Sequence, residues 1–426
     1  MHSLHRLGVQ FNVTDDDELD LRNFGGQKKK RTAFAQSDTG KQLMTALIDA
    51  VRREESAGTV ERFPHHKFRT LLFSGNICGG CTVQDTYTGE LLRFVCDAVL
   101  IATGGPHGLF GDTTGSLANT GEVTAELFRL GVPMANLEMI QYHPTTVEQG
   151  GKRMLLSEAA RGEGGRLLAL RNGKPWYFME EKYPELGNLM PRDITAREVW
   201  TVSRDYEVFL DMTELPKEVM EHKLAGLVDD CQTYLHKDIR KEPIPILPGI
   251  HYFMGGIQVD ERHRTSMRNL YAAGECCAQY HGANRLGGNS LLGAIYGGQI
   301  AAETACQEAA GSPNMPCAEK PLLPDLSPDA QMQMNRILLN ALGVVRDTQT
   351  LETGVQEIRK LSGTLPLLGR AMLESALARK ESRGAHWRAD YPQRNDAVYC
   401  KTTVAHWNGQ HIAISFKSIP ERRYDL

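Results

Sequence analysis

Seven side chains suited to binding or protonating an acid stand among glycine and turn residues in the middle of the chain. They are His143, Ser157, Glu158, Arg161, Arg192, His251 and Arg285. Glycine lets a ligand approach the backbone closely. Arginine pairs both oxygens of a carboxylate with a planar fork, and histidine adds a further donor. Any one of these residues is more often a structural hydrogen-bonding group, but the set predicts a site for a small substrate with two carboxylates.

Glu158 and Arg161 lie three residues apart in SEAARGEGG, a spacing that places both on one face of a helix. One interpretation is an exposed ion pair worth about a few tenths of a kcal/mol. The other is a proton path in which the carboxylate passes a proton between two guanidinium groups. The GEGG stretch that follows is not typical of a solvated helix face and favours the proton path.

Two predicted strands end in glycine, where an α/β sheet presents its backbone to a ligand. They are contained in DAVLIATGG (97–105) and RNLYAAGE (268–275). The stretch HGANRLGGNS then leads into a helix predicted from Asn289 to about residue 311. These segments predict an α/β fold whose strand ends and helix start surround a binding site.

Other segments predict how this site is supported. Ser37 and Asp38 resemble the cap of a helix over 40–55, and a second helix is expected over 119–131. The chain changes character between about 132 and 250, which indicates an inserted domain. Beyond a Pro-rich linker, the pattern over 328–383 is helical, and a pair of strands is expected around VAHWNGQHIAISF.

Composition excludes several classes of protein. The net charge of −4 offers no basic surface for nucleic acid, and no apolar run reaches the roughly 18 residues of a membrane span. Nine cysteines in a long chain indicate scattered thiols. Cys78 and Cys81 in CGGC lack a second ligand pair for zinc, so that stretch predicts a strand, a Gly-Gly turn and a strand. We predict no metal site.

Seven motifs in order resemble the flavoprotein subunits of fumarate reductase and succinate dehydrogenase, whose relatives include L-aspartate oxidase. The motifs are QYHPTT, LLSEAARGEGG, MPRDITARE, HYFMGGIQVD, LYAAGE, HGANRLGGNSLL and SRGAHWRADYPQRND. The likeness covers nearly the whole chain. It implies an enzyme that interconverts fumarate and succinate.

The resemblance assigns a role to each of the seven polar residues. His143, His251 and Arg285 are implied to hold the substrate carboxylates, and Ser157 stands where a hydroxyl donor is common. Arg192 is implied to exchange the proton at one substrate carbon, with Glu158 and Arg161 as its relay. Arginine can serve as an acid only if it is reprotonated as it gives its proton up, within a closed and dry site.

The resemblance also implies flavin adenine dinucleotide (FAD) as the cofactor, with hydride passing through flavin N5. Glu275 is expected to meet the ribose, and the first turn of the helix after residue 289 is expected to stabilise charge on the reduced ring. The expected cofactor-binding residues are Ala102, Thr103, Gly104, Gly105, Glu275, Asn284, Arg285, Ser290 and Leu291.

The implied fold is an incomplete FAD-binding Rossmann-like domain with an inserted α+β capping domain and a C-terminal helical domain. Its expected parts are 1–131 and 251–312 for FAD, 132–250 for the cap, and 325–426 for the helical domain and tail. The chain departs from the family in having TGEV at 120–123 and no GxGxxG after an N-terminal strand. We therefore expect the N-terminal dinucleotide-binding unit, which grips the pyrophosphate, to be missing.

Two alternatives stay open, an L-aspartate oxidase and a truncated, non-catalytic remnant that acts only in binding or assembly. The tail NDAVYCKTTVAHWNGQHIAISF favours the quinone-linked subunits over the oxidase. The resemblance implies a C4-dicarboxylate substrate, an iron–sulfur partner subunit and, through it, a membrane anchor. We expect a cytoplasmic protein, held at the inner face of the cell membrane through such partners.

Overall fold

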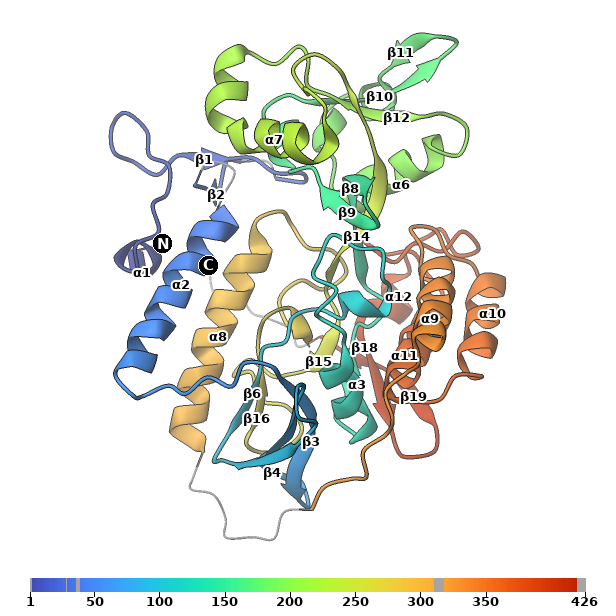
Figure 1. Ribbon diagram of the computed structural model, residues 1–426. Coiled ribbons are helices and arrows are strands. Elements are labelled where there is room, and N and C mark those ends of the chain that lie inside the picture. The colour runs from blue at the N-terminus through green and yellow to red at the C-terminus, as the bar shows by residue number, and fades with distance from the viewer. Residues whose placement is uncertain (1, 28, 36–38, 310–317, 420–426) are drawn as a thin grey trace. The chain divides into compact units, whose positions relative to one another are not determined.

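The computed structural model describes residues 2–27, 29–35, 39–309 and 318–419 (Figure 1). The chain divides into two compact units, and each is described by itself. Unit 1 comprises Met1–Pro64, His143–Gly249 and Leu286–Gly288. Unit 2 comprises His65–Tyr142, Ile250–Arg285 and Asn289–Leu426. The four-part division expected from the sequence stays a prediction.

Unit 1 contains a four-stranded antiparallel sheet with strand order β11-β10-β12-β13. In the register of β10 and β12, Leu167 pairs with Leu210, and both are fully buried. Apolar residues of the surrounding helices, including Met179 and Val199, complete this core. The strands are β10 (Arg166–Arg171), β11 (Lys174–Trp176), β12 (Val208–Asp211) and β13 (Ile244–Pro245).

Unit 1 also contains helices and short strands that precede, interrupt or follow the strands of this sheet along the chain. The helix predicted over 40–55 is confirmed as α2 (Thr39–Ser56), while Ser37 and Asp38 lie outside the described residues. The other elements are α1 (His2–Arg6), β1 (Leu21–Arg22), β2 (Thr32–Ala33), β9 (Lys152–Leu155), α4 (Ala159–Gly162), α5 (Phe178–Lys182), α6 (Arg192–Val202) and α7 (Ala225–Asp230). Strands β8 (Ile140–Gln149) and β14 (Leu247–Phe253) carry the chain between the units.

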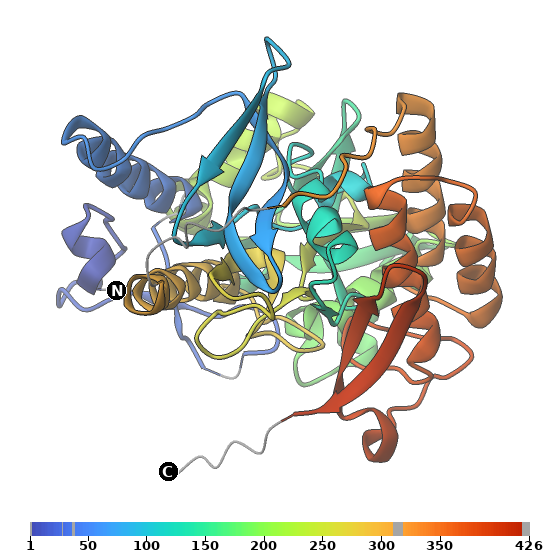
Figure 2. The same cartoon turned by 90° about the horizontal axis from the view of Figure 1, so that it is seen from below.

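Unit 2 has a five-stranded sheet with strand order β17-β15-β7-β18-β19. The expected pair of tail strands is confirmed as the hairpin of β18 and β19, drawn in red in Figure 2, which packs against α11. The strands are β7 (Met134–Ala135), β15 (Gly256–Gln258), β17 (Cys277–Ala278), β18 (Lys401–Trp407) and β19 (Ile412–Ser418).

Two short parallel strands form a second sheet of unit 2. Residues Val99–Ile101 make β6, residues Leu270–Ala272 make β16, and Ile101 pairs with Ala272. Both strands predicted to end in glycine are thus present, although each is shorter than its motif. Because the two strands are parallel, their carboxyl ends, which carry the glycines, lie at one edge of the sheet.

The prediction that the glycine pair in CGGC forms a turn between two strands is wrong. Cys78 and Cys81 lie inside strand β4 (Ile77–Asp85), and the chain turns earlier, at Gly75, whose φ of +56° suits a tight turn. Gly80 is needed within the strand because a Cβ there would lie 1.9 Å from the carbonyl oxygen of Phe94. Strands β3 (His66–Ser74) and β5 (Leu91–Val95) flank β4 in an antiparallel sheet.

The helical pattern over 328–383 is confirmed as three packed helices, orange in Figure 1. They are α9 (Pro328–Ala341), α10 (Thr348–Ile358) and α11 (Thr364–Ala378). Ser327 caps α9 and Asp347 caps α10, each through a side-chain oxygen that accepts a backbone N–H. The other α-helices in the described part of unit 2 are α3 (Glu122–Arg129), α8 (Asn289–Glu308) and α12 (Asp396–Tyr399).

Candidate active site

In unit 1, the carboxylate of Glu158 lies between the guanidinium groups of Arg161 and Arg192. Arg192 donates from Nε and Nη2 to Oε2 at 3.0 and 2.6 Å, and Arg161 donates from Nη2 to Oε1 at 2.9 Å. Their residue exposures are 3% for Glu158, 2% for Arg161 and 6% for Arg192. This burial rules out the exposed ion pair, which was one of the two interpretations of the sequence.

The charges of the two arginines decide the protonation state of Glu158. Burial alone raises the pKa of a carboxyl group, but the nearby Arg192 and Arg161 lower that of Glu158 to about 2. Burial lowers the pKa of Arg161, against the opposing effect of Glu158. At neutral pH Glu158 is therefore a carboxylate that accepts hydrogen bonds from both cations.

Two glycines that the sequence analysis did not assign to the site leave room for Glu158. The backbone N–H of Gly25 donates to Oε1 at 3.2 Å, and a Cβ on Gly25 would lie 2.6 Å from that oxygen. A Cβ on Gly287 would lie 2.5 Å from Oε2. The glycine pairs in RNFGGQ and RLGGN were visible in the sequence, but nothing there indicated contact with a glutamate more than a hundred residues away.

Short segments of unit 1 position the other predicted residues. Arg192 begins α6 directly after Pro191, and Arg161 also donates to the carbonyl oxygen of Asn188 at 2.6 Å. Ser157 accepts the backbone N–H of Ala159 at 3.2 Å through Oγ. This contact leaves the hydroxyl proton of Ser157 to be donated elsewhere.

His143 is buried, at the point where β8 enters unit 1. Its Nδ1 atom lies 3.3 Å from the backbone nitrogen and 3.2 Å from the hydroxyl oxygen of Thr145. The carbonyl oxygen of Thr145 also lies 3.3 Å from Nδ1, so contacts with Thr145 orient the His143 ring.

Unit 2 holds His251 and Arg285, two of the residues expected to bind the substrate carboxylates. Nδ1 of His251 lies 2.8 Å from the hydroxyl oxygen of Thr114, which orients the ring. The guanidinium carbon of Arg285 lies 4.3 Å from the centre of the Tyr252 ring. Burial raises the pKa of Tyr252, so its ring stays neutral under this cation.

Seven of the nine expected cofactor residues, all except Asn284 and Arg285, lie after β6, after β16 or at the start of α8. Ala102 and Thr103 are exposed beyond β6, and the backbone N–H of Ala273 donates to the carbonyl oxygen of Ile101 at 2.9 Å. This bond places the Ala102–Gly105 loop beside the turn at Gly274–Cys276. Helix α8 packs against that turn and supplies Ser290 and Leu291 in its first helical turn.

The Glu275 carboxylate packs tightly against the Ala102–Gly105 loop and its neighbours. Oε1 lies 3.0 Å from the backbone nitrogen of Phe253 and 3.2 Å from Nε2 of His107. A Cβ on Gly105 would lie 2.6 Å from the same oxygen. Both protein contacts go to Oε1, so Oε2 is the oxygen that suits a ribose hydroxyl. Exposed loop backbone, a glycine cradle and an acidic side chain fit the binding of a dinucleotide.

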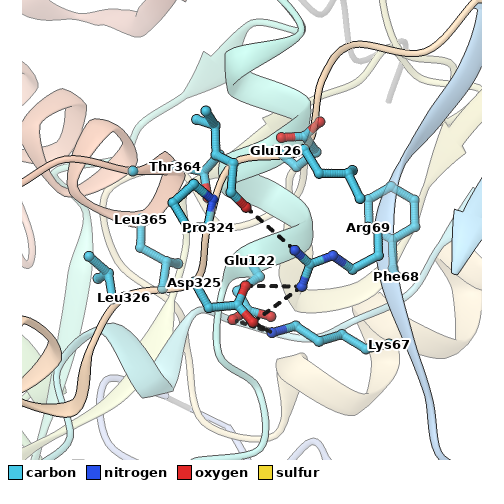
Figure 3. A pocket seen from close by; sticks show the side chains of 13 residues that line it. Lys67, Phe68, Arg69, Glu122, Glu126, Pro324, Asp325, Leu326, Thr364 and Leu365 are labelled. Carbon is cyan, nitrogen blue, oxygen red and sulfur yellow. Dashed lines mark hydrogen bonds and ion pairs between the residues drawn. The ribbon is translucent and has the colours of Figure 1, made fainter. Parts of the chain in front are cut away.

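A cavity between β3, α3 and the strap that leads to α9 contains none of the predicted site residues (Figure 3). Its volume of about 30 Å³ suits a single water molecule and no substrate. Lys67 and Arg69 each reach the Asp325 carboxylate at 3.0 Å, and Arg69 also donates to the carbonyl oxygen of Leu323. These ion pairs fasten the strap to β3, which indicates a structural role.

Neither a metal site nor a membrane span emerges from the part of the chain that the structure describes. In those residues, histidine, cysteine, aspartate and glutamate form no group of three or more able to hold a metal ion. No described helix is both long and apolar enough to cross a bilayer. Cys276 and Cys277 are buried beside Gly274 and Glu275, and their thiols contact the carbonyl oxygens of Ala273 and Gly274.

Comparison with known proteins identifies the class to which this fold and site belong. Residues 1–291 match the FAD binding domain family, and residues 362–424 match the C-terminal domain of the fumarate reductase flavoproteins. The chain is thus an FAD-dependent oxidoreductase with FAD as its cofactor.

Individual relatives narrow this class. A succinate dehydrogenase flavoprotein subunit from Bacillus subtilis (strain 168) is 37% identical over 95% of this chain and 78% of the relative. An L-aspartate oxidase from Streptomyces coelicolor is 30% identical over 97% of this chain and 78% of the relative. Among solved structures, a quinol fumarate reductase flavoprotein from E. coli matches with a TM-score of 0.87 and 26% identity, covering 98% of this chain and 81% of the other. The chain belongs to the succinate dehydrogenase and fumarate reductase flavoprotein family.

Proposed function

We propose that this protein interconverts fumarate and succinate, with Arg192 exchanging a proton with one carbon of the four-carbon acid. The observation that carries the proposal is the buried pairing of Arg192 with Glu158, and of Glu158 with Arg161. When bound, FAD supplies hydride transfer at its N5 atom to the other substrate carbon.

In this reaction the protein's own side chains carry the proton to and from the substrate. In reduction, Arg192 gives a proton to the substrate, and Arg161 resupplies Arg192 with a proton by way of Glu158. Burial disfavours two cations close together, and the pKa of Arg161 is already lowered by burial. The 2.6 Å contact between Arg192 and Glu158 gives the proton a direct hydrogen-bonded route. Oxidation of succinate uses the same route in reverse.

Hydrogen bonds and ion pairs with the carboxylates of the substrate would hold it in the site. We propose that His251 and Arg285 pair with carboxylate oxygens and that His143 and Ser157 add donors. Thr114 fixes the His251 ring, and Tyr252 supports the Arg285 guanidinium. Donors held in place before binding lose little conformational freedom when the substrate arrives.

For the cofactor, we propose that nine residues around β6, β16 and α8 contact FAD. The N-terminus of α8 would stabilise negative charge on the reduced ring, since a helix N-terminus carries partial positive charge. Oε2 of Glu275 would accept from a ribose hydroxyl. The nine are Ala102, Thr103, Gly104, Gly105, Glu275, Asn284, Arg285, Ser290 and Leu291.

A substrate panel tests the proposed function. The purified flavin-loaded protein should oxidise reduced methyl viologen when fumarate is added and should reduce an artificial acceptor when succinate is added. L-aspartate is the third arm, because the aspartate oxidase relative covers nearly the whole chain. Oxidation of L-aspartate without fumarate reduction would replace the proposal with the oxidase. Lack of turnover with all three substrates would favour a non-catalytic role in binding or assembly.

We further propose that an iron–sulfur subunit exchanges electrons with the flavin and docks near α9–α11, and that it links the chain to the inner face of the cell membrane. A groove of about 430 Å³ lies beside α10 and α11, and its lining includes Arg129, Lys320, Arg359 and Arg370. Glu126 and Glu374 partly balance these cations, which leaves a basic surface for an acidic segment. Native purification that recovers this chain alone with full quinone-linked activity would contradict the proposal.

A further inference from the structure

The segment Ala283–Arg285 carries the proposed carboxylate-binding arginine, and two other parts of unit 2 hold it by hydrogen bonds. We propose that Gln141 is a positioning residue for Arg285 and that the turn at Gly384–Ala385 supports the same segment from a second element. This inference rests on the proposed role of Arg285 in binding a dicarboxylate. Gln141, Gly384 and Ala385 are not among the site residues expected from the sequence.

Gln141 lies in β8 and is fully buried. Its Nε2 atom donates to Oδ1 of Asn284 at 2.9 Å and to the carbonyl oxygen of Arg285 at 2.7 Å. An uncharged amide nitrogen carries two hydrogens, so one side chain can hold both acceptors at once. Glutamate has the same shape as glutamine but would present oxygen where both donors are needed.

The second support is a turn in the SRGAH motif. The backbone N–H of Ala385 donates to the carbonyl oxygen of Ala283 at 2.9 Å. Gly384 has φ of +55°, and a Cβ there would lie 2.4 Å from the same carbonyl oxygen. The turn therefore approaches Ala283 at a distance that only glycine allows.

A buried histidine holds this turn in place. Nδ1 of His386 lies 2.9 Å from Nη1 of Arg346, and its Nε2 lies 3.1 Å from the carbonyl oxygen of Arg379. Because arginine can only donate, Nδ1 must accept and Nε2 must carry the proton. Burial and the nearby Arg346 lower the pKa of His386 well below its usual value, so the ring stays in this neutral form.

Arg346 joins the two supports. The Nη1 atom that meets His386 also donates to the backbone carbonyl oxygen of Glu138 at 2.7 Å, three residues before Gln141. Arg346 is itself buried, with 1% exposure. The segment that leads into β8 and the histidine that follows the Gly384–Ala385 turn are thus tied to one guanidinium group. Arg285 is held from two directions by elements that share a single anchor.

A comparison of two glutamine variants tests the positioning role. In the flavin-loaded enzyme, Gln141→Met should raise the KM for fumarate roughly tenfold or more, because the arginine is no longer held in its binding position. It should change kcat less, since Arg192 and Glu158 are untouched. Gln331→Met is the matched control, because Gln331 also donates from its side-chain amide to a carbonyl oxygen, that of Gly108. Its KM should equal that of the parent.

A double-mutant cycle separates positioning from general loss of structure. The effects of Arg285→Lys and Gln141→Met on KM should be strongly non-additive. Once Arg285 has been replaced, removing the side chain that positions it should raise KM little further. Additive effects, or a KM for Gln141→Met equal to that of Gln331→Met, would overturn the inference. Gln141→Glu keeps the shape of the side chain and serves if the methionine variant does not fold. Failure of the parent to turn over fumarate would instead overturn the proposed function, and this inference with it.

Discussion

Arg192 Nη2 lies 2.6 Å from Glu158 Oε2, and both side chains are almost completely buried. A buried ion pair of this kind is costly to desolvate, and its geometry must be close to ideal to be retained. Here Glu158 receives two hydrogen bonds from Arg192, one from Arg161 and one from the backbone of Gly25. The full set of donors keeps the carboxylate charged in a dry environment.

Replacing Arg192 with lysine should abolish most turnover while the protein keeps its flavin. Loss of a positioned acid costs about 10²- to 10⁴-fold in rate, and lysine cannot make the two contacts that Arg192 makes with Glu158. Steady-state fumarate reduction and the visible flavin spectrum measure the two quantities. Arg197→Lys on the same helix is the control and should leave the rate unchanged. Substantial fumarate reduction by Arg192→Lys would refute the assignment of the acid.

Replacing Glu158 with glutamine should slow fumarate reduction and succinate oxidation to a similar extent. The amide keeps the shape of the side chain but cannot accept a proton and return it, so both directions lose the same relay. Rates measured in both directions on one preparation test this. A variant that is slow in one direction only, at equal flavin content, would contradict a shared proton route.

Glu158 should also make part of the stability dependent on pH. Its pKa is lowered from 4.5 to about 2 in the folded protein, so its stabilising contribution is fully present above pH 4.5. The contribution is lost as the pH falls from about 4.5 through 2, where the carboxylate is protonated. The difference in unfolding free energy between the parent and Glu158→Gln should therefore shrink over this range. Urea unfolding at several pH values measures it, and a constant difference would contradict the prediction.

Gly25→Ala should impair catalysis although Gly25 belongs to none of the motifs that contact substrate. A Cβ at this position would lie 2.6 Å from Oε1 of Glu158 and 2.9 Å from the carbonyl oxygen of Met190. We expect a drop in kcat larger than the change in KM, since the proton relay is displaced. Gly40→Ala is the control, because a Cβ at Gly40 has no other atom within 4 Å. Equal kinetics for the two variants would show that the relay tolerates the displacement.

Arg285→Ala should weaken dicarboxylate binding by about 2–4 kcal/mol, the cost of removing one donor from a desolvated carboxylate. Calorimetric titration with malonate, a dicarboxylate that cannot be reduced in this reaction, measures binding without turnover. Flavin content measured on the same sample separates loss of substrate from loss of cofactor. Unchanged malonate affinity at full flavin content would contradict the carboxylate-binding role.

Local patterns were sufficient for much of the fold. A cap and helical spacing predict α2, the helical pattern over 328–383 predicts α9–α11, and the motif VAHWNGQHIAISF predicts the β18–β19 pair, because these signals act over a few residues. The CGGC stretch was predicted wrongly because that prediction also used only a few neighbouring residues. A glycine pair usually indicates a turn, but Gly80 is required by the close approach of the Phe94 carbonyl on a neighbouring strand. That requirement comes from strand pairing and is invisible in the local sequence.

The sequence by itself determined which chemistry to expect: the residue types around Glu158, Arg192 and Arg285 predict a substrate with two carboxylates, and the ordered motifs resemble those of a flavoprotein family. Only the tertiary structure decided that Glu158 is buried between two arginines and that Gly25 donates to it across 133 positions of sequence. It also showed Gln141 bridging Asn284 and Arg285, 143 and 144 positions away. Burial and long-range hydrogen bonds arise when distant segments pack together, and no spacing along the chain encodes them.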